Sequence, residues 1–208
     1  KNMSELKLFT SMSRKIFHDL INPASAALNG LELLNSTLKE EHREIIDTDI
    51  LDLIQASIEK ITSQIKFYRY IYSGINNDEE SEIPKSQIDK LIQDYTRFTK
   101  LEVSLDIVSN TIRYVHSHFL SNFILLFTQL FPAGAHINVQ LLDDKKIQIT
   151  AEPLAGKINN ETFEDLSTRA IGDIENIQAE YLRRLLTRLN INYKINLSAK
   201  NYIKILQV

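Results

Sequence analysis

The chain has 208 residues, of which 43% are hydrophobic and 25% charged, and its formal net charge at pH 7 is -3. This length allows one or two domains with a hydrophobic core, and the charge gives no reason to expect nucleic acid or an anionic membrane as a partner. The absence of cysteine excludes disulfides and thiolate metal sites and favours a cytoplasmic protein, as does the lack of a membrane-spanning run or signal-peptide pattern.

The first half of the chain has the spacing of long amphipathic helices, with apolar or small residues at steps of three or four. The first series is Leu6, Phe9, Ser13, Ile16, Leu20, Ala24, Ala27, Leu31, Leu34 and Leu38. A turn is expected at 35–44, and the next helix includes Thr48 and Asp49. Its series is Ile46, Ile50, Ile54, Ile58, Ile61, Ile65, Tyr68, Tyr72 and Ile75. Two long helices with a short connection predict an antiparallel hairpin.

Some apolar residues of these helices lie outside the seam that would join them. Phe17, Leu33, Leu53 and Ile71 are examples. Two hairpins that pair into a four-helix bundle would bury such residues, so we expect a homodimer. The alternative is that the second half of the chain covers this surface.

The segment at 73–86, SGINNDEESEIPKS, is polar and acidic and contains a proline. Such composition is typical of a linker, which we place at 77–85. The expected domains are therefore a helical hairpin at 1–76 and a second domain at 86–208.

The second domain mixes the two periods of helices and strands. In chain order we expect a helix at 86–98 with Ser86 as its N-cap, a strand at 101–107, a helix at 113–131 that ends before Pro132 and Gly134, two strands joined around Asp143 to Lys146, helices at 160–167 and 174–189, and two final strands. A few strands with helices on one face make a two-layer α/β sandwich, and the fold class of the whole chain is then α+β.

His18 is expected on the surface of the first helix. At about 100° per residue, the seam positions Leu20 and Ala24 place His18 on the opposite face. The residues that extend the same polar stripe are Ser11, Arg14, Asn22, Ser25 and Asn29. A buried core histidine is therefore disfavoured.

Pro23 lies one turn beyond Asp19 in the same helix. It cannot donate a hydrogen bond to the carbonyl of Asp19, so the helix should bend or loosen within one turn of His18.

The segment from Phe17 to Pro23, FHDLINP, is similar to the H-box of two-component sensor kinases, in which an acidic residue follows the histidine and Thr or Asn precedes proline. The longer stretch at 22–34, NPASAALNGLELL, resembles the ChpT family of histidine phosphotransferases from alphaproteobacterial phosphorelays. The resemblance implies a kinase-like dimerisation hairpin followed by a degenerate Bergerat-like domain that does not bind ATP.

The second half agrees with this resemblance. The segment NFILLFTQLFPAGAHINV, which begins at Asn122, lines up with the N-box helix and following strand of kinase ATP domains, and 177–189 resembles the last helix of the ChpT family. Leu126 stands where kinases carry the magnesium-binding asparagine, and Gln129 where a basic residue usually follows. A kinase strand would next end in Asp-x-Gly-x-Gly, but TAEPLAGKI offers only Glu152 and Gly156.

The resemblance implies a phosphorelay protein that accepts phosphoryl on His18 from the receiver-domain aspartate of an upstream hybrid kinase and passes it to another response regulator. A neutral imidazole is a competent nucleophile. The chain itself would hold no cofactor and no metal, because the receiver would supply Mg²⁺, and no autokinase activity is expected.

Further residues around His18 are candidates for supporting roles. Asp19 and Asn22 are candidate catalytic residues, although Asp19 has the alternative reading of a solvated acid. The candidates for binding a receiver are Arg14, Ser25, Lys66 and Arg69, and a solvated basic face is the alternative for the last two. The alternatives for the whole chain are a kinase fragment that binds ATP, and an adaptor that binds receivers without phosphorylation.

The remaining histidines give weaker signals. His116 and His118 are two residues apart on a predicted helix, so they face apart and do not form a metal pair. His42 and His136 are expected to be structural or solvated residues without a functional role. The cluster Arg183, Arg184 and Arg188 reads as an exposed basic face, with a secondary receiver contact as the alternative.

Overall fold

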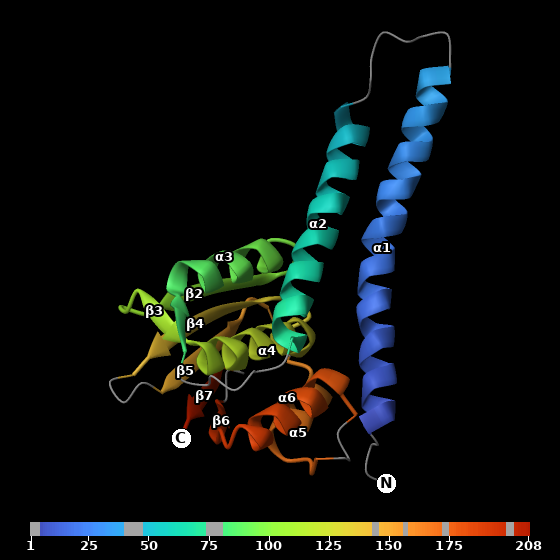
Figure 1. The fold of residues 1–208 in the computed structure, drawn as a ribbon. Coiled ribbons are helices and arrows are strands. Elements are labelled where there is room, and N and C mark those ends of the chain that lie inside the picture. The colour runs from blue at the N-terminus through green and yellow to red at the C-terminus, as the bar shows by residue number, and fades with distance from the viewer. Residues whose placement is uncertain are drawn as a thin grey trace.

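The structure is a computed structural model that describes residues 5–39, 48–73, 81–142, 146–155, 158–171, 175–198 and 202–208. It confirms the α+β class, with a helical hairpin followed by an α/β sandwich (Figure 1). The hairpin consists of α1 (Glu5–Lys39) and α2 (Thr48–Tyr72). Its outer half stands clear of the sandwich, whereas the lower part of α2 packs on it (Figure 1). No helix in the described ranges is long and apolar enough to cross a membrane.

Small residues allow α1 and α2 to pack closely. Pro23, Ala27 and Gly30 are buried in α1. A Cβ atom on Gly30 would lie only 2.7 Å from Cγ1 of Ile54 in α2, so a glycine is what this approach requires. Helix α1 continues through Pro23 without interruption.

The apolar seam differs in part from the expected series. Ala27 and Ile54 are buried as expected. Several other members are exposed instead: Leu6, Phe9, Leu31, Ile58 and Ile65. The two helices are apolar on more than one face, so the spacing alone cannot say which apolar residues face the neighbouring helix.

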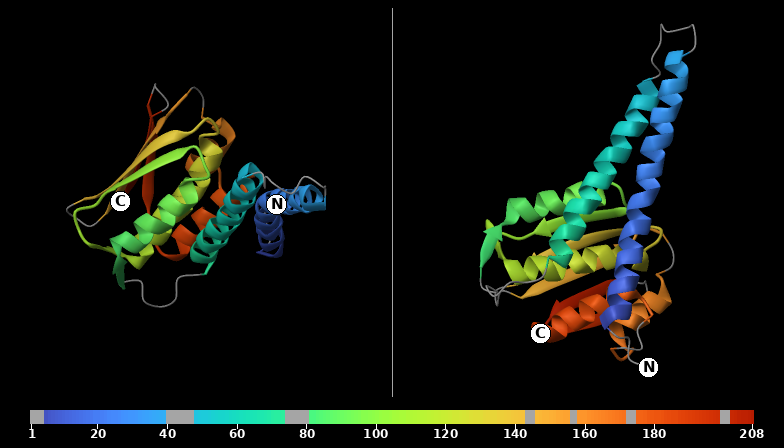
Figure 2. Two further views of the ribbon diagram at one scale, coloured as in Figure 1. Left: turned by 90° about the horizontal axis from the view of Figure 1, so that it is seen from above. Right: turned by 45° about the vertical axis from the view of Figure 1, so that its right-hand side comes forward.

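The sandwich contains a sheet of five strands in the order β2-β4-β5-β7-β6, and a small sheet formed by β1 and β3. Its elements are β1 (Glu82–Pro84), α3 (Lys85–Thr96), β2 (Leu101–Asp106), β3 (Thr111–Arg113), α4 (Tyr114–Leu130), β4 (Ala135–Leu141), β5 (Ile147–Pro153), α5 (Asn160–Ser167), α6 (Ile177–Arg188), β6 (Tyr193–Leu197) and β7 (Ile203–Gln207). Strands β2 and β4 are parallel and the other pairs antiparallel. The helices cover one face of the large sheet and leave the other open (Figure 2).

The core lies between this sheet and α4. Phe119, Phe123 and Phe127 are almost fully buried along α4. In β2 and β4 inward and outward side chains alternate, which is the pattern of a sheet with one solvated face. Burial of a large apolar side chain contributes roughly 1.5–3 kcal/mol, so α4 anchors the domain.

Some boundaries differ from the sequence-based expectation. Strand β1 pairs with β3 and lies inside the segment expected to be a linker at 77–85. Helix α3 begins at Lys85, so Ser86 is not its N-cap. Helix α6 begins only at Ile177, because the side chain of Asn176 accepts hydrogen bonds from Gln178 N and Ala179 N. The predicted 35–44 turn lies mostly outside the described residues, as do His42 and Gly156.

Aromatic residues fix the lower end of α2 to the sandwich. The ring of Phe67 stacks on Tyr95 of α3, with centroids 4.0 Å apart. Tyr181 of α6 donates a hydrogen bond of 3.1 Å to the carbonyl of Ile71. Ile71 is fully buried here, so its assignment to a dimer surface is wrong and the alternative, coverage by the second domain, holds for this residue.

Candidate functional site

The site begins with His18, which is on α1 and strongly exposed. Its side chain retains 73% of its accessible surface, and Nδ1 lies 3.5 Å from Oδ1 of Asp19. No hydrogen bond or ion pair joins the other ring nitrogen, Nε2, to a described residue. A protonated Nδ1 would donate toward the carboxylate and leave the lone pair of Nε2 available to a reactant.

Asp19 is held from both sides. Its Oδ2 accepts a hydrogen bond of 2.7 Å from the hydroxyl of Tyr68 in α2, and lies 3.3 Å from Nζ of Lys15 one turn earlier. The Asp19 side chain is only 24% exposed. Burial is the main cause that raises the pKa of Tyr68, so this hydroxyl remains a proton donor. The carboxylate of Asp19 is thereby fixed beside the imidazole.

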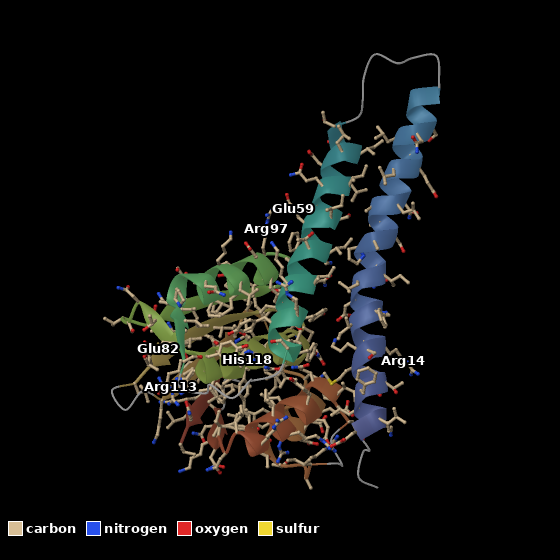
Figure 3. The ribbon with its side chains drawn as sticks, viewed as in Figure 1. Arg14, Glu59, Glu82, Arg97, Arg113 and His118 are labelled. Carbon is tan, nitrogen blue, oxygen red and sulfur yellow. The ribbon has the colours of Figure 1, made fainter. Side chains whose placement is uncertain are left out.

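The polar stripe around His18 has the exposure expected from its spacing. The exposed members are Arg14, Asn22, Ser25 and Asn29, and Ser11 is half-buried. Figure 3 shows the side chain of Arg14 pointing away from α2. Pro23, in contrast, is buried. The exposed stripe therefore surrounds His18 on the side of α1 that a partner can approach.

Lys66 and Arg69 lie on α2 and not on the polar stripe of α1 that contains His18. The contact between Tyr68 and Asp19 sets this part of α2 at the height of His18. Both residues line a cavity of about 460 Å³ between α2 and α3. Its other lining residues are Tyr70, Ser73, Gln87, Lys90, Leu91 and Asp94. Within one chain, no described contact joins Lys66 or Arg69 to His18.

The part of α4 that resembles the kinase N-box lies among buried side chains. Leu126 is fully buried in α4. Gln178 of α6 donates a hydrogen bond of 3.0 Å to Oδ1 of Asn122, and accepts one of 2.7 Å from the hydroxyl of Tyr72. These contacts join α2, α4 and α6 through buried polar groups.

A second group of polar contacts closes the same region between α4, α5 and α6. The side-chain amide of Asn176 donates to Oε1 of Gln129 at 2.8 Å, and its backbone N–H donates to Oδ2 of Asp165 at 2.8 Å. Asp165 is fully buried and also bonds Arg169 at 2.9 Å. These acceptors are therefore already used by protein groups.

The other candidate residues are either buried in the core or paired with protein groups. His116 and His118 are buried in α4, and burial is the main cause that lowers the pKa of each to about 4. His136 is exposed and lies 2.9 Å from Glu102. Arg183 donates to the carbonyl of Asp165 and Arg184 pairs with Glu180. In the described part of the chain, no group of three or more acidic or histidine side chains could hold a metal ion.

Sequence reasoning missed Tyr68 and Lys15 as neighbours of Asp19. The four-residue spacing of Lys15 and Asp19 was a usable signal, because such pairs meet on one helix face. Tyr68 gave no such signal, since its contact depends on the register between α1 and α2.

Comparisons with known proteins bear on the fold and the family of the chain. The family model for the histidine phosphotransferase C-terminal domain matches residues 86–201. No protein with a curated description matches the chain. The solved structure of a bacterial phosphotransferase is similar over 100% of this chain and 98% of its own, with 21% identity and a TM-score of 0.75, which shows a shared fold.

Histidine kinases are more distant. The Acinetobacter baumannii histidine kinase AdeS has 9% identity and a TM-score of 0.40, over 91% of this chain and 95% of its own. The histidine kinase domain from the Erythrobacter litoralis EL346 blue-light activated kinase has 9% identity and a TM-score of 0.44, over 95% of this chain and 94% of its own. The family model, which spans more than half of the chain, shows that this chain belongs to the ChpT-type family of histidine phosphotransferases.

Proposed function

We propose that the chain relays phosphoryl groups between receiver domains, with Nε2 of His18 as the phosphoacceptor. The observation that supports this most directly is the exposure of His18 beside a carboxylate that two other side chains hold in place. The direction of flow between the two receivers follows from their relative phosphorylation, because the transfer is reversible.

The step is an in-line transfer. The lone pair of Nε2 forms an N–P bond while the bond between phosphorus and the receiver's aspartyl oxygen breaks, and the electron pair stays on the released carboxylate. Asp19 faces Nδ1 and stabilises the positive charge that develops on the ring. The reverse of the same step delivers phosphoryl to the next receiver.

The receiver supplies Mg²⁺ and most of the charge stabilisation, and this chain supplies the docking surface. Arg14, Asn22 and Ser25 are exposed on the His18 stripe and are suited to contact the receiver or the phosphoryl oxygens. Lys66 and Arg69 lie at the same height on α2 and would add positive charge for an incoming acidic site.

ATP and its metal do not fit the second domain. A triphosphate with Mg²⁺ needs polar ligands and open space. Leu126 is buried and apolar. In the region between α4 and α6, Oδ1 of Asn122 accepts from Gln178 and Oε1 of Gln129 accepts from Asn176, while the buried Nε2 of Gln129 has no hydrogen-bond partner among the described residues. The proposal therefore includes no autokinase step.

The proposed relay protein is a homodimer. Phe17 and Leu28 of α1 are 69% and 57% exposed, and Ile58 and Ile65 of α2 are 51% and 47% exposed. Monomeric proteins rarely expose such continuous apolar stripes, and a second hairpin would bury them in a four-helix bundle. Replacement of Leu28 and Ile58 by glutamate should convert the protein to monomers in sedimentation equilibrium.

The central experiment mixes the protein with a receiver that a kinase has phosphorylated with ³²P. Wild type should acquire acid-labile label, His18→Gln should not, and His136→Gln should label as wild type does. His136 is a matched control, because it is another exposed histidine paired with a carboxylate. Label that persists in His18→Gln would overturn the site, and label from ATP alone would overturn the absence of autokinase activity.

A further inference from the structure

Strand β6 lies at the edge of the large sheet and pairs only with β7 within the described ranges. The N–H of Val208 donates to the carbonyl of Asn192, and that of Ser198 donates to the carbonyl of Tyr202. In an antiparallel ladder, residue pairs that exchange backbone hydrogen bonds alternate with pairs that do not. Because Asn192 and Ser198 are bonded, the backbone groups of the even-numbered residues from 192 to 198 are those that bond β7. Tyr193, Ile195 and Leu197 therefore direct their N–H and C=O groups outward, away from the sheet.

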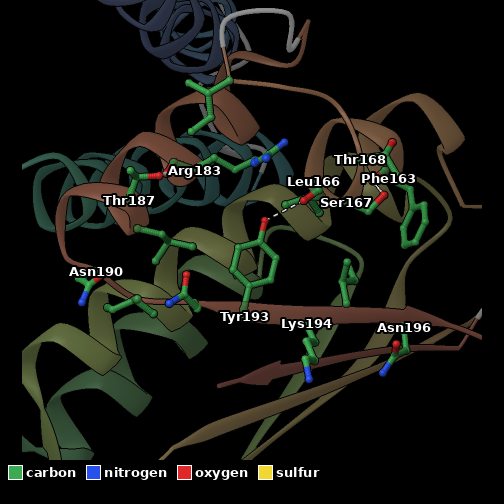
Figure 4. Close-up of a pocket in the computed structure, with 15 residues that line it drawn as sticks. Phe163, Leu166, Ser167, Thr168, Arg183, Thr187, Asn190, Tyr193, Lys194 and Asn196 are labelled. Atoms are coloured by element: carbon green, nitrogen blue, oxygen red, sulfur yellow. Dashed lines mark hydrogen bonds between the residues drawn. The ribbon is translucent and has the colours of Figure 1, made fainter.

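A groove runs beside this edge. It has a volume of about 680 Å³ and lies between β6, α5 and α6 (Figure 4). Its apolar lining residues are Phe163, Leu166, Ile171, Leu186, Ile191 and Ile195, of which Leu166 and Leu186 are almost fully buried. The rest of the lining is polar or charged and includes Ser167, Thr168, Thr187, Asn190, Asn192 and Asn196. The hydroxyl of Tyr193 donates a hydrogen bond of 2.7 Å to the carbonyl of Leu166, which ties the strand to α5 across the groove (Figure 4). A strand added to β6 would place every second side chain against this lining.

The charged residues that line the groove, among those the structure describes, have one sign. They are Arg183 and Lys194, and no Asp or Glu is among the described lining residues. The opposite edge strand, β2, instead carries the exposed carboxylates of Glu102 and Asp106. Charged side chains, proline and bulges usually protect an edge from added strands. On β6 the described residues include only Lys194 as a charge and no proline.

We propose that the β6 edge docks an extended segment of a partner protein in which apolar and acidic residues alternate. The outward N–H and C=O groups of Tyr193, Ile195 and Leu197 specify a backbone in strand conformation. Its apolar side chains would enter the groove, and its acidic ones would lie on the open face of the sheet beside Lys194. A second copy of this chain would offer β6 itself, which has a lysine and no acid and so lacks the complementary charge.

The test uses a fluorescein-labelled peptide of alternating valine and glutamate, and the same peptide with lysine in place of glutamate. The dissociation constant measured by fluorescence anisotropy should be at least tenfold lower for the glutamate peptide than for the lysine peptide. Hydrogen exchange of the backbone N–H groups, measured by NMR, should slow at Tyr193, Ile195 and Leu197 when the peptide binds. The N–H groups of Lys194 and Asn196 should change little, because they are already bonded to β7. Equal binding of both peptides, or protection at other residues, would overturn the proposal.

Two variants sharpen the test. Ile195→Pro removes one outward N–H without removing a bond to β7, and should weaken binding at least tenfold while thermal unfolding stays cooperative. Lys194→Glu leaves the backbone intact and should reverse the preference between the peptides, whereas Lys90→Glu on the exposed surface of α3 should not. The wild-type protein without peptide is also tested for assemblies larger than the proposed dimer. If these form, and if Ile195→Pro abolishes them, the occupant of the edge is a second copy of the chain and the partner proposal fails.

Discussion

The hydroxyl of Tyr68 donates a 2.7 Å hydrogen bond to Oδ2 of Asp19, and the other oxygen of that carboxylate lies 3.5 Å from Nδ1 of His18. Burial raises the pKa of Tyr68, so its hydroxyl remains protonated and acts only as a donor toward the carboxylate. The position of the carboxylate beside the imidazole thus depends on α2 as well as on α1.

Replacement of Tyr68 by phenylalanine should slow phosphoryl transfer to His18 by about threefold to tenfold, because a hydrogen bond to a charged group contributes about 1.5–3 kcal/mol and only part of it acts on the imidazole. Single-turnover transfer from a phosphorylated receiver measures this rate. Tyr72→Phe is the matched control, since it loses a hydroxyl bonded to Gln178 rather than to Asp19. Equal slowing in both variants would show that Tyr68 acts on stability and not on Asp19.

Asp19→Asn should reduce the rate of phosphoryl transfer by about 10- to 100-fold, since it keeps the size of the side chain but removes the charge that stabilises the cationic ring. Lys15→Met removes the other partner of Asp19 and should have a smaller effect, because Tyr68 still holds the carboxylate. The same single-turnover assay applies. An unchanged rate in Asp19→Asn would show that the Asp19 carboxylate has no role in the transfer.

Gly30→Ala should destabilise the protein by about 1–3 kcal/mol, because the new Cβ would lie 2.7 Å from Cγ1 of Ile54 and force α1 away from α2. The gain of about 0.5–1 kcal/mol in helix propensity is too small to offset this. Asn29→Ala, one residue earlier on the exposed face, is the control and should leave stability almost unchanged. Urea unfolding distinguishes the two, and a more stable Gly30→Ala would contradict the close packing.

Stability should fall as the pH drops from about 6.5 to about 4. Burial lowers the pKa of His118 to about 4, so in this range the unfolded chain binds a proton that the native chain does not. The sign is therefore a loss of stability that levels off below pH 4, and the contribution of His118 to it is up to about 3 kcal/mol. His116, whose pKa burial also lowers to about 4, contributes in the same direction.

His118→Phe tests this directly, because the ring stacks on Tyr70 with centroids 4.5 Å apart and neither nitrogen has a hydrogen-bond partner among the described residues. Urea unfolding between pH 4 and 7 should show a flatter pH profile for the variant. His136→Phe replaces an exposed imidazole and serves as the control. If His118→Phe has the same profile as wild type, other groups cause the acid sensitivity.

Much of the fold could be predicted from the sequence. The α5 boundaries at 160–167 agree with the structure to the residue, because the cap Asn159 and the apolar spacing are local signals. Strands β1 and β3 were missed, since each has three residues and neither is long enough to show a period. The exposure of His18 was also predictable from its place between the polar residues Arg14 and Asn22.

The sequence by itself determined the two-part organisation and the exposed His18, because periodicity and residue type are properties of short segments. Only the tertiary structure decided that Tyr68 reaches Asp19, that Ile71 is covered by the sandwich, and that β6 leaves an open edge. These depend on helix register, domain docking and strand order, which are set by packing between segments far apart in the chain.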